Sequence, residues 1–374
     1  MPRLSRFATP YGSEAFVTAE MAGGDNAEKD VLTLIGEYSS FLDEHALNAD
    51  SEVFIRFHLR DLRSESGVLK RILEKRGVPS FYSLVGQPPS GGGRIAIEAY
   101  HIKSAGAVIK SKVSENELIL DHGGYRSLWM RSGPTGAGPC GRQTREMFES
   151  LAAKLGERGA LVKDSVIRTW CFIGDIHKNY ASFVKARKEF FSSLGMTGET
   201  HTPASTGIGA LNDGGGPVVM DSLSVLGLEP AQRDHMSVPE YMSPPYAYDV
   251  TFERGTKIVY GDRTHYYVSG TASIDTQGNA LYPDDAEKQA LKALENIRAL
   301  LNAYEADLAD MKMMVVYLQD RGEYPSIRGL LREVLPEKLP YIVVRGSVCR
   351  TSWLVEMEGI AVSEARNERF RPFC

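Results

Sequence analysis

The sequence lacks the patterns that mark several large classes of protein. It has 374 residues but only four cysteines, none of which forms a CxxC pair, so it indicates neither a zinc site nor a disulfide framework. No stretch of about 18 apolar residues occurs, and the opening segment MPRLSRFATPYGSEAF has no continuous apolar core. We therefore expect neither a transmembrane helix nor a signal peptide, and we expect a cytoplasmic location.

Motifs for metal, nucleotide and serine-hydrolase chemistry are also missing. The eight histidines show neither HxxxH nor HExxH spacing, so no metal site and no cofactor are expected. The Gly-rich runs at 133–141 and 212–217 match neither a P-loop nor GxGxxG, which leaves phosphate binding without support. Because GxSxG does not occur, the sequence gives no ground for a Ser-His-Asp triad.

The composition is that of an ordinary globular protein. Apolar residues make up 43% and charged residues 24%, and the length is enough for two domains with a sizeable core. A net charge of −5 and a pI near 6.0 give no general attraction to nucleic acid or to an anionic membrane. The expected partner is a small anionic metabolite, which local arginines would have to hold against this acidic background.

An internal repeat organises the chain. Each copy reads as strand, helix, strand, helix, strand, and Asp175 and Asp320 correspond at an offset of 145 residues. Two such modules, with helices packed on mixed sheets, predict an α+β fold. The predicted division is an N-terminal extension (1–48), a degenerate module (49–228), a linker (229–245) and a second module that carries the pocket (246–374).

The strongest candidate for chemistry lies near the end of the chain. Residues 339–362 read as two strands rich in Val, Ile, Trp and Leu. Alternation along the second strand places Glu356 and Glu358 on one face, and a carboxylate is rarely buried unless it is paired or used. Either this face is partly solvated at a sheet edge, or one glutamate lines a pocket with a raised pKa suited to proton donation.

Three stretches of the second module resemble the Rid family, also called YjgF or L-PSP. They are VSGTASID (268–275), GNALYPDDAEKQALKALENI (278–297) and VEMEGIAV (355–362). A single Rid module is far shorter than this chain, and the layout over residues 125–362 resembles the chorismatases, in which a degenerate Rid module precedes a recognisable one. The resemblance implies two tandem Rid/chorismate-mutase-like β-α-β modules, with the N-terminal one degenerate.

The resemblance also implies roles for single residues. In chorismatases the glutamate of the last strand is the proton donor, which places that role on Glu356. Cys349, seven positions earlier, together with Gly270 is similar to the type that forms 3-hydroxybenzoate. The segment 246–254 (YAYDVTFER) departs from the arginine-rich approach of the family, so the family's carboxylate-binding residues cannot all be assigned.

Residue types supply further candidates for binding a substrate with two carboxylates. Arg350, Arg254 and Arg187 can each bind a carboxylate in bidentate fashion, and Tyr180 and Thr206 can bind through their hydroxyl groups. Each candidate has a structural alternative. The alternatives are a solvated or salt-bridged Arg187, a helix-capping Tyr180, a turn-forming Thr206, close packing at Gly270 and an ordinary buried Cys349.

The predicted function is a lyase or hydrolase that cleaves chorismate, or a similar enolpyruvyl ether, to pyruvate and a cyclic or aromatic acid. The alternatives are a Rid-type enamine or imine hydrolase and a non-catalytic metabolite-binding protein. Rid deaminases hold the substrate carboxylate with an arginine on the penultimate strand, where this chain has Ile342; the nearby Arg345 faces the opposite side unless a bulge intervenes. Rid modules form trimers with pockets at the seams, so a trimer or a single-chain pseudo-trimer is expected.

Overall fold

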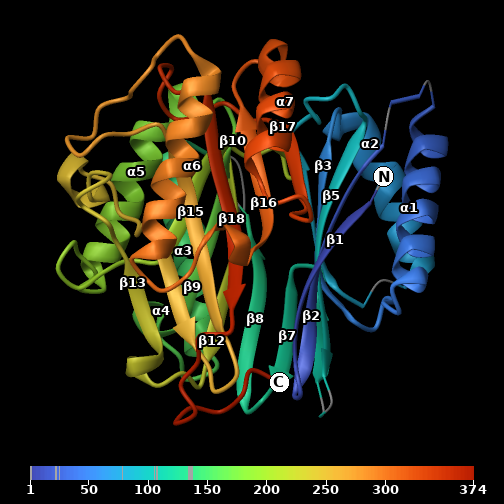
Figure 1. Cartoon of the computed structure of the whole chain (residues 1–374), viewed down its shortest axis with the longest axis horizontal. Helices are drawn as coiled ribbons and strands as arrows, with labels where there is room; N and C mark the ends of the chain where they lie inside the picture. Colours follow the sequence, from blue (N-terminus) through green and yellow to red (C-terminus); the bar gives the residue numbers. More distant parts are fainter. Residues whose placement is uncertain are drawn as a thin grey trace.

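A computed structural model of the chain describes residues 2–21, 23–24, 26–77, 79–104, 106, 108–133 and 138–374. Three six-stranded sheets of mixed strand direction, with helices packed against them, form the fold (Figure 1). This arrangement confirms the predicted α+β class. Residues 134–137 of the Gly-rich run 133–141 lie outside the described part.

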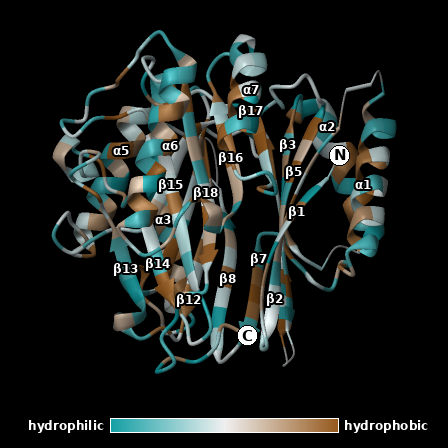
Figure 2. Cartoon of the chain, viewed as in Figure 1, coloured by the Kyte–Doolittle hydropathy of each residue, from teal (hydrophilic) through white to brown (hydrophobic). Residues whose placement is uncertain are grey.

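The first sheet has the strand order β1-β2-β5-β3-β4-β11. Its strands are β1 (Arg3–Thr9), β2 (Gly12–Glu20), β3 (Glu52–Leu59), β4 (Phe81–Gly86), β5 (Ile95–Ser104) and β11 (Leu211–Asn212). Helices α1 (Ala27–Glu44) and α2 (Leu62–Arg76) pack against it around an apolar core of their own. Figure 2 shows the hydrophobic side of α1 turned toward the sheet and its hydrophilic side turned outward, as expected of an amphipathic surface helix.

The second sheet has the order β10-β9-β12-β8-β7-β6. Its strands are β6 (Ile109–Ser114), β7 (Glu117–His122), β8 (Tyr125–Ser132), β9 (Val166–Ile173), β10 (Ala204–Gly209) and β12 (Val218–Leu226). Helices α3 (Cys140–Gly156), α4 (Val162–Ser165) and α5 (Ile176–Ser193) accompany it. A second apolar cluster joins α3 and α5 to β8, β9 and β12.

The third sheet has the order β13-β14-β15-β18-β16-β17. Its strands are β13 (Arg233–Met236), β14 (Gly255–Val259), β15 (Thr264–Ala272), β16 (Met311–Leu318), β17 (Tyr341–Arg345) and β18 (Val355–Ser363). Helices α6 (Ala286–Asn302) and α7 (Tyr324–Val334) cover it, and short 3-10 turns lie at η1 (Pro230–Gln232), η2 (Pro245–Tyr248), η3 (Leu308–Asp310) and η4 (Arg321–Glu323). Because β18 lies between β15 and β16, its glutamates do not sit at a sheet edge.

All three sheets repeat one four-stranded topology, in the orders β2-β5-β3-β4, β8-β12-β9-β10 and β15-β18-β16-β17. In each, the last two strands are parallel and the second strand is antiparallel to both neighbours. The sequence revealed two of these repeats, and the structure contains three.

The predicted division of the chain therefore differs from the layout of the sheets. The boundary at residue 48 separates β1, β2 and α1 from the sheet to which they belong, and the range 49–228 joins parts of two sheets. The expected linker 229–245 contains β13, which pairs with β14. The sequence pattern did not predict the N-terminal repeat because β2 is buried on both faces through most of its length. Such a strand shows no alternation of apolar and polar residues.

Each pair of sheets is joined by a buried ion pair. The three seams bring β4 against β8, β10 against β15 and β2 against β16. Burying charges is costly unless they are paired, so these contacts fix how the sheets meet, and removing one partner is strongly destabilising. The pairs are Arg56–Asp221 (3.0 Å) between the first and second sheets, Arg168–Glu358 between the second and third, and Arg263–Glu14 (2.5 Å) between the third and first. Among the described residues, no helix has both the length and the apolar character needed to cross a membrane.

Candidate functional site

A cavity of about 170 Å³ lies at the seam between the second and third sheets. Helix α5 and strand β10 form one wall, β15 and the loop before β18 form the other, and the segment 248–254 closes it. The space is roughly ten times what one buried water needs, which is enough for a small metabolite. Seven of the eight predicted site residues line it: Tyr180, Arg187, Arg254, Gly270, Cys349, Arg350 and Glu356.

Glu356 and Glu358 share one face of β18, as predicted, but their surroundings differ. Glu358 accepts hydrogen bonds from Arg168, from Thr206 and from the Tyr317 hydroxyl, the last at 2.6 Å. Glu356 is only 6% exposed, and within the described part of the chain its carboxyl group has no hydrogen-bond partner. Glu358 thus serves the structure, whereas the Glu356 carboxyl is available to a ligand in the cavity.

The surroundings of Glu356 favour its protonated form. Burial, and then the nearby Glu358 carboxylate, raise the pKa of Glu356 to about 8, against the lowering effect of Arg168 and Arg254. A carboxylic acid with this pKa carries its proton at neutral pH and can donate it to a bound molecule.

Cys349 is a neutral neighbour of this acid. Burial, and then Glu356, raise the pKa of the Cys349 thiol to about 12, while a hydrogen bond with the Tyr180 hydroxyl lowers it. Only a thiolate is a good nucleophile, so Cys349 acts here as a small, weakly polar wall. Tyr180 lies inside α5, whose N-cap is Asp175, so the capping role considered for Tyr180 is wrong.

A β-bulge shapes the wall next to Glu356. The pairing of β15 with β18 shifts register around Gly270, and the Gly270 N–H donates to Thr206 Oγ1 at 2.9 Å. A Cβ atom at Gly270 would overlap the Glu356 carboxyl oxygen and lie 3.0 Å from its Cδ atom. Glycine is needed here because the acid occupies the space that any side chain would take.

Thr206 is the one predicted binding residue that does not line the cavity. Its neighbours Ser205 and Gly207 face the cavity, so alternation along β10 turns Thr206 to the other side. There its hydroxyl donates to Glu358 and accepts the Gly270 N–H. Thr206 therefore positions the bulge and the structural carboxylate, and the prediction that it contacts substrate finds no support in this placement.

Arg187 is a buried cation for which the described part of the chain supplies no anion. It is 2% exposed, so the solvated alternative is wrong. Its Nε donates to Thr251 Oγ1 at 3.1 Å, and its Nη1 lies 3.4 Å from Ser205 Oγ. None of the described carboxylates forms an ion pair with it. Burying an unpaired charge is costly, and a negatively charged ligand in the cavity would remove that cost.

Arg254, which is buried, and Arg350, which is half-buried, add two more cations to the cavity. Arg254 is 3% exposed; its Nη2 donates to the Ser243 carbonyl (2.6 Å) and the Tyr248 hydroxyl (2.7 Å), and its Nε has no partner. Arg350 donates to the Gly278 carbonyl at 2.7 Å and lies over the Trp353 ring. In the part of the chain that the structure describes, neither is ion-paired to a carboxylate. Three unpaired arginines and one protonated acid make this cavity suited to a ligand with two negative charges.

Sequence reasoning missed the aromatic part of the lining. Tyr248 and Phe252 flank the Arg254 guanidinium, with ring centroids 5.6 and 5.5 Å from its Cζ atom. The sequence feature that could have indicated these residues is the spacing of aromatic residues before the arginine in YAYDVTFER. Only Arg254 of this segment was predicted as a binding residue, because the segment departs from the family pattern. Among the described residues, the lining contains no histidine and a single carboxylate, which is a poor set of donors for a divalent metal.

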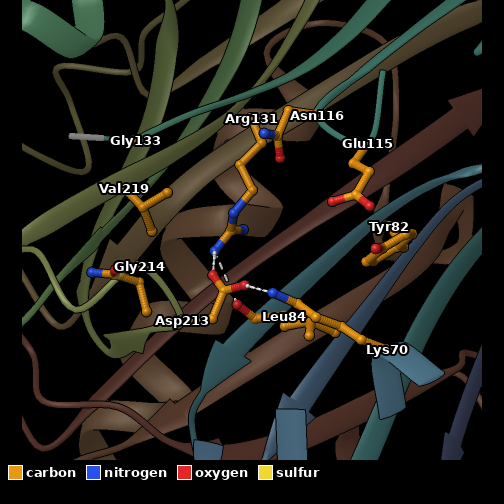
Figure 3. Close-up of a pocket in the computed structure, with 11 residues that line it drawn as sticks. Lys70, Tyr82, Leu84, Glu115, Asn116, Arg131, Gly133, Asp213, Gly214 and Val219 are labelled. Carbon is orange, nitrogen blue, oxygen red and sulfur yellow. Dashed lines mark hydrogen bonds and ion pairs between the residues drawn. The ribbon is translucent and has the colours of Figure 1, made fainter. Parts of the chain in front are cut away.

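A second cavity, of about 260 Å³, lies between the first and second sheets (Figure 3). Its basic side chains are matched by acids: Lys70 lies 2.8 Å and Arg131 3.3 Å from Asp213, and Arg131 lies 2.9 Å from Asp221. Figure 3 shows the lysine and the arginine converging on Asp213. This cavity therefore lacks the unpaired positive charge that distinguishes the first one.

The arginine expected of a Rid deaminase is not in the cavity. Ile342 is buried in the core, and Arg345 is exposed. The pairing of β17 with β16 is uninterrupted, so no bulge turns Arg345 toward the cavity. Arg350, which follows β17 in the chain, does line the cavity and could take the carboxylate-binding role in such a reaction.

Comparison with known proteins by sequence gives matches of two kinds. The family model described as Endoribonuclease L-PSP matches residues 257–363. A 3-hydroxybenzoate synthase of Streptomyces hygroscopicus is 28% identical over 254 residues, which cover 60% of this chain and 71% of that protein. The 3-aminoacrylate deaminase RutC of Acinetobacter baylyi is 30% identical over 126 residues, which cover 33% of this chain and 94% of that protein.

Comparison of structures extends the likeness to the first sheet. A solved chorismatase superposes with a TM-score of 0.66 and 17% identity, covering 95% of this chain and 100% of that one. At this identity the likeness concerns the fold, and it includes the N-terminal region in which the sequence resemblance was weak.

Proposed function

The chain belongs to the Rid (L-PSP) superfamily and has the fold of a chorismatase, and from this premise we propose that it cleaves chorismate, or a similar enolpyruvyl ether with two carboxylates, to pyruvate and a cyclic acid. One observation carries the proposal. A buried acid with a raised pKa faces the same cavity as three arginines, and among the described residues the acid has no hydrogen-bond partner and the arginines have no carboxylate partners.

The arginines hold the substrate. Arg187 approaches from the second sheet, and Arg254 and Arg350 approach from the third. Guanidinium groups bind carboxylates with two parallel hydrogen bonds, which fixes orientation as well as charge. Two carboxylates held in this way place the enolpyruvyl group against Glu356.

Glu356 starts the reaction by donating its proton to the terminal carbon of the enolpyruvyl double bond. A C–H bond forms there, and the positive charge left behind is shared between the adjacent carbon and the ether oxygen. When water captures this carbon it loses a proton, which returns to the Glu356 carboxylate, and the resulting hemiketal breaks into pyruvate and an alcohol. A well-placed general acid contributes about 10²–10⁴-fold in rate.

The favoured product is of the 3-hydroxybenzoate type. In that route a ring hydroxyl captures the cation in place of water, and the atoms of chorismate divide between pyruvate and 3-hydroxybenzoate with no net water consumed. Cys349 and Gly270 suit this route because both are small and hold no water strongly. The relative named 3-hydroxybenzoate synthase supports the choice.

The experiment is incubation of the purified protein with chorismate, with pyruvate measured by coupling to lactate dehydrogenase and the cyclic product identified by chromatography. Glu356→Gln should lose pyruvate formation while keeping its circular dichroism spectrum. Glu364→Gln, at an exposed position just after β18, is the matched control and should retain full activity.

A second candidate is a Rid-type enamine or imine hydrolase, which the 30% identity to a 3-aminoacrylate deaminase favours. It predicts release of ammonia from 2-iminobutyrate that is faster than any release of pyruvate from chorismate, and a dependence on Arg350. A protein that binds chorismate tightly and turns over neither substrate would be a metabolite-binding protein.

The assembly proposed is a pseudo-trimer within one chain. Three sheets of one topology each contact the other two within the chain. The expected result of sedimentation is activity in a particle of 41.2 kDa; activity found only in a larger particle would contradict this.

A further inference from the structure

Outside the cavity, His201, His235 and Glu253 converge from three separate segments. His201 lies in the loop before β10, His235 lies in β13, and Glu253 precedes β14. A parallel bridge between Ala204 and Glu253, together with the pairing of β13 and β14, brings them together. One potential ligand atom from each residue lies within 4.8 Å of the others. The expectation that no metal site exists rested on local spacing, and local spacing cannot detect donors 18 and 34 residues apart.

The carboxylate of this cluster is buried without a strong counter-charge. Glu253 is 7% exposed; its Oε1 accepts the Thr202 N–H at 3.2 Å and lies 3.4 Å from His201 Nδ1. Among the described residues, no lysine or arginine is ion-paired to it.

The two histidines bring their rings together beside this carboxylate. The rings of His201 and His235 stack with centroids 4.4 Å apart and planes 10° apart. His235 is half-buried. Its Nδ1 atom is buried and has no hydrogen-bond partner in the described structure, whereas a buried polar atom is normally satisfied.

We propose that His201, His235 and Glu253 form a binding site for a divalent transition metal, with Zn²⁺ as the preferred ion. Two imidazoles and a carboxylate are a common protein donor set for Zn²⁺, completed by water, and exposed His201 leaves the site open to solvent. His201 Nδ1 and Glu253 Oε1 lie 3.4 Å apart. In a tetrahedral site with metal–ligand bonds of about 2.0–2.1 Å, two ligand atoms lie about 3.3 Å apart. Because the two rings are stacked nearly parallel, one of them must rotate about its side-chain bonds so that both in-plane nitrogen lone pairs point at the ion.

The ion would act on the neighbouring cavity by positioning. Glu253 directly precedes Arg254, and Ser269 in β15 holds both: its Oγ donates to the Glu253 carbonyl (2.5 Å) and its N–H to the Arg254 carbonyl (2.9 Å). A metal bound by these residues would connect the loop before β10, strand β13 and the segment before β14. It would thereby hold the backbone that carries the Arg254 side chain in place. This inference stands independently of the reaction proposed above.

The test is titration of the full-length, chelator-stripped protein with Zn²⁺ by isothermal calorimetry, with melting temperatures measured with and without Zn²⁺. Wild type should bind about one Zn²⁺ per chain and melt at a higher temperature with it. His201→Ala removes an exposed ligand without disturbing the core, and it should weaken binding by at least about 100-fold, more than the typical loss on removing an outer-shell partner. His235→Ala should do the same.

The matched control is His177→Ala, at an exposed position on α5, which should bind Zn²⁺ like wild type. The proposal is overturned by a wild-type protein that shows no saturable heat of Zn²⁺ binding. It is equally overturned when folded His201→Ala binds Zn²⁺ as tightly as the control.

Discussion

Replacing Gly270 with alanine tests the geometry around the proposed acid. The new Cβ atom would overlap the Glu356 carboxyl oxygen and lie 3.0 Å from Cδ of Glu356 and 3.1 Å from Cγ2 of Thr206. Because backbone hydrogen bonds hold β15 and β18, the carboxyl group must move away from its position. We expect kcat for pyruvate formation to fall by about 10²–10⁴-fold, which is what a general acid contributes, and unfolding free energy to fall by about 1–3 kcal/mol through overpacking.

The assay is steady-state pyruvate release together with urea unfolding. Gly67→Ala is the control, because Gly67 lies in α2 and a Cβ atom there meets nothing within 4 Å; alanine in a helix should stabilise the protein by about 0.5–1 kcal/mol without changing kcat. A Gly270→Ala enzyme with wild-type kcat would refute the placement of Glu356 as the acid beside this bulge.

Four further predictions concern charge. Because Glu356 must be protonated, kcat should be level below pH 8 and fall about tenfold per unit above it; a rate that rises above pH 8 would contradict the acid role. The pKa of Glu356 is about 8 in the folded state against an ordinary value of 4.5, so between these pH values the native state holds a proton that the unfolded state has released. The free energy of unfolding should therefore fall as pH rises from 5 to 9, by about 4–5 kcal/mol at most. Urea unfolding of Glu356→Gln should lack this fall. Arg187→Lys should raise KM about 10- to 100-fold with little change in kcat, since a lysine cannot bind a carboxylate in bidentate fashion; an unchanged KM would remove Arg187 from the binding site. Glu358→Gln should lower unfolding free energy by about 3–5 kcal/mol, because Arg168 is left buried without its partner, and a wild-type melting temperature would show that the ion pair is not needed.

Alternation along one strand was enough to predict the face that Glu356 and Glu358 share, because the two-residue period of a strand is a local property. The different roles of the two carboxylates were not predictable in this way. Glu358 is held by Arg168 and Thr206, residues 190 and 152 positions away in sequence, and no local pattern reports such a contact.

The burial of Arg187 illustrates the same limit. Its surroundings in sequence, VKARKEFF, are those of a charged helix surface. The structure buries this position because the segment before β14, including Thr251 and Phe252, packs over that side of α5. The contact arises only when two modules meet, so helix periodicity within one module cannot reveal it.

The N-terminal repeat, which forms the first sheet, was not predicted from the sequence for a related reason. Strand β2 is buried on both faces and carries Glu14, whose charge is matched by Arg263 and His265 of the third sheet. A strand that is buried on both sides and contains a paired carboxylate does not resemble a typical amphipathic strand. The strand orders of the three sheets show the repeat that the pattern of residues did not.

The measurement that tests the central claim most directly is turnover of chorismate by wild type, Glu356→Gln and Glu364→Gln at pH 7, with pyruvate and the cyclic product quantified together. The account predicts equal amounts of pyruvate and 3-hydroxybenzoate from wild type and Glu364→Gln, and neither from a folded Glu356→Gln. Full pyruvate formation by Glu356→Gln would contradict it.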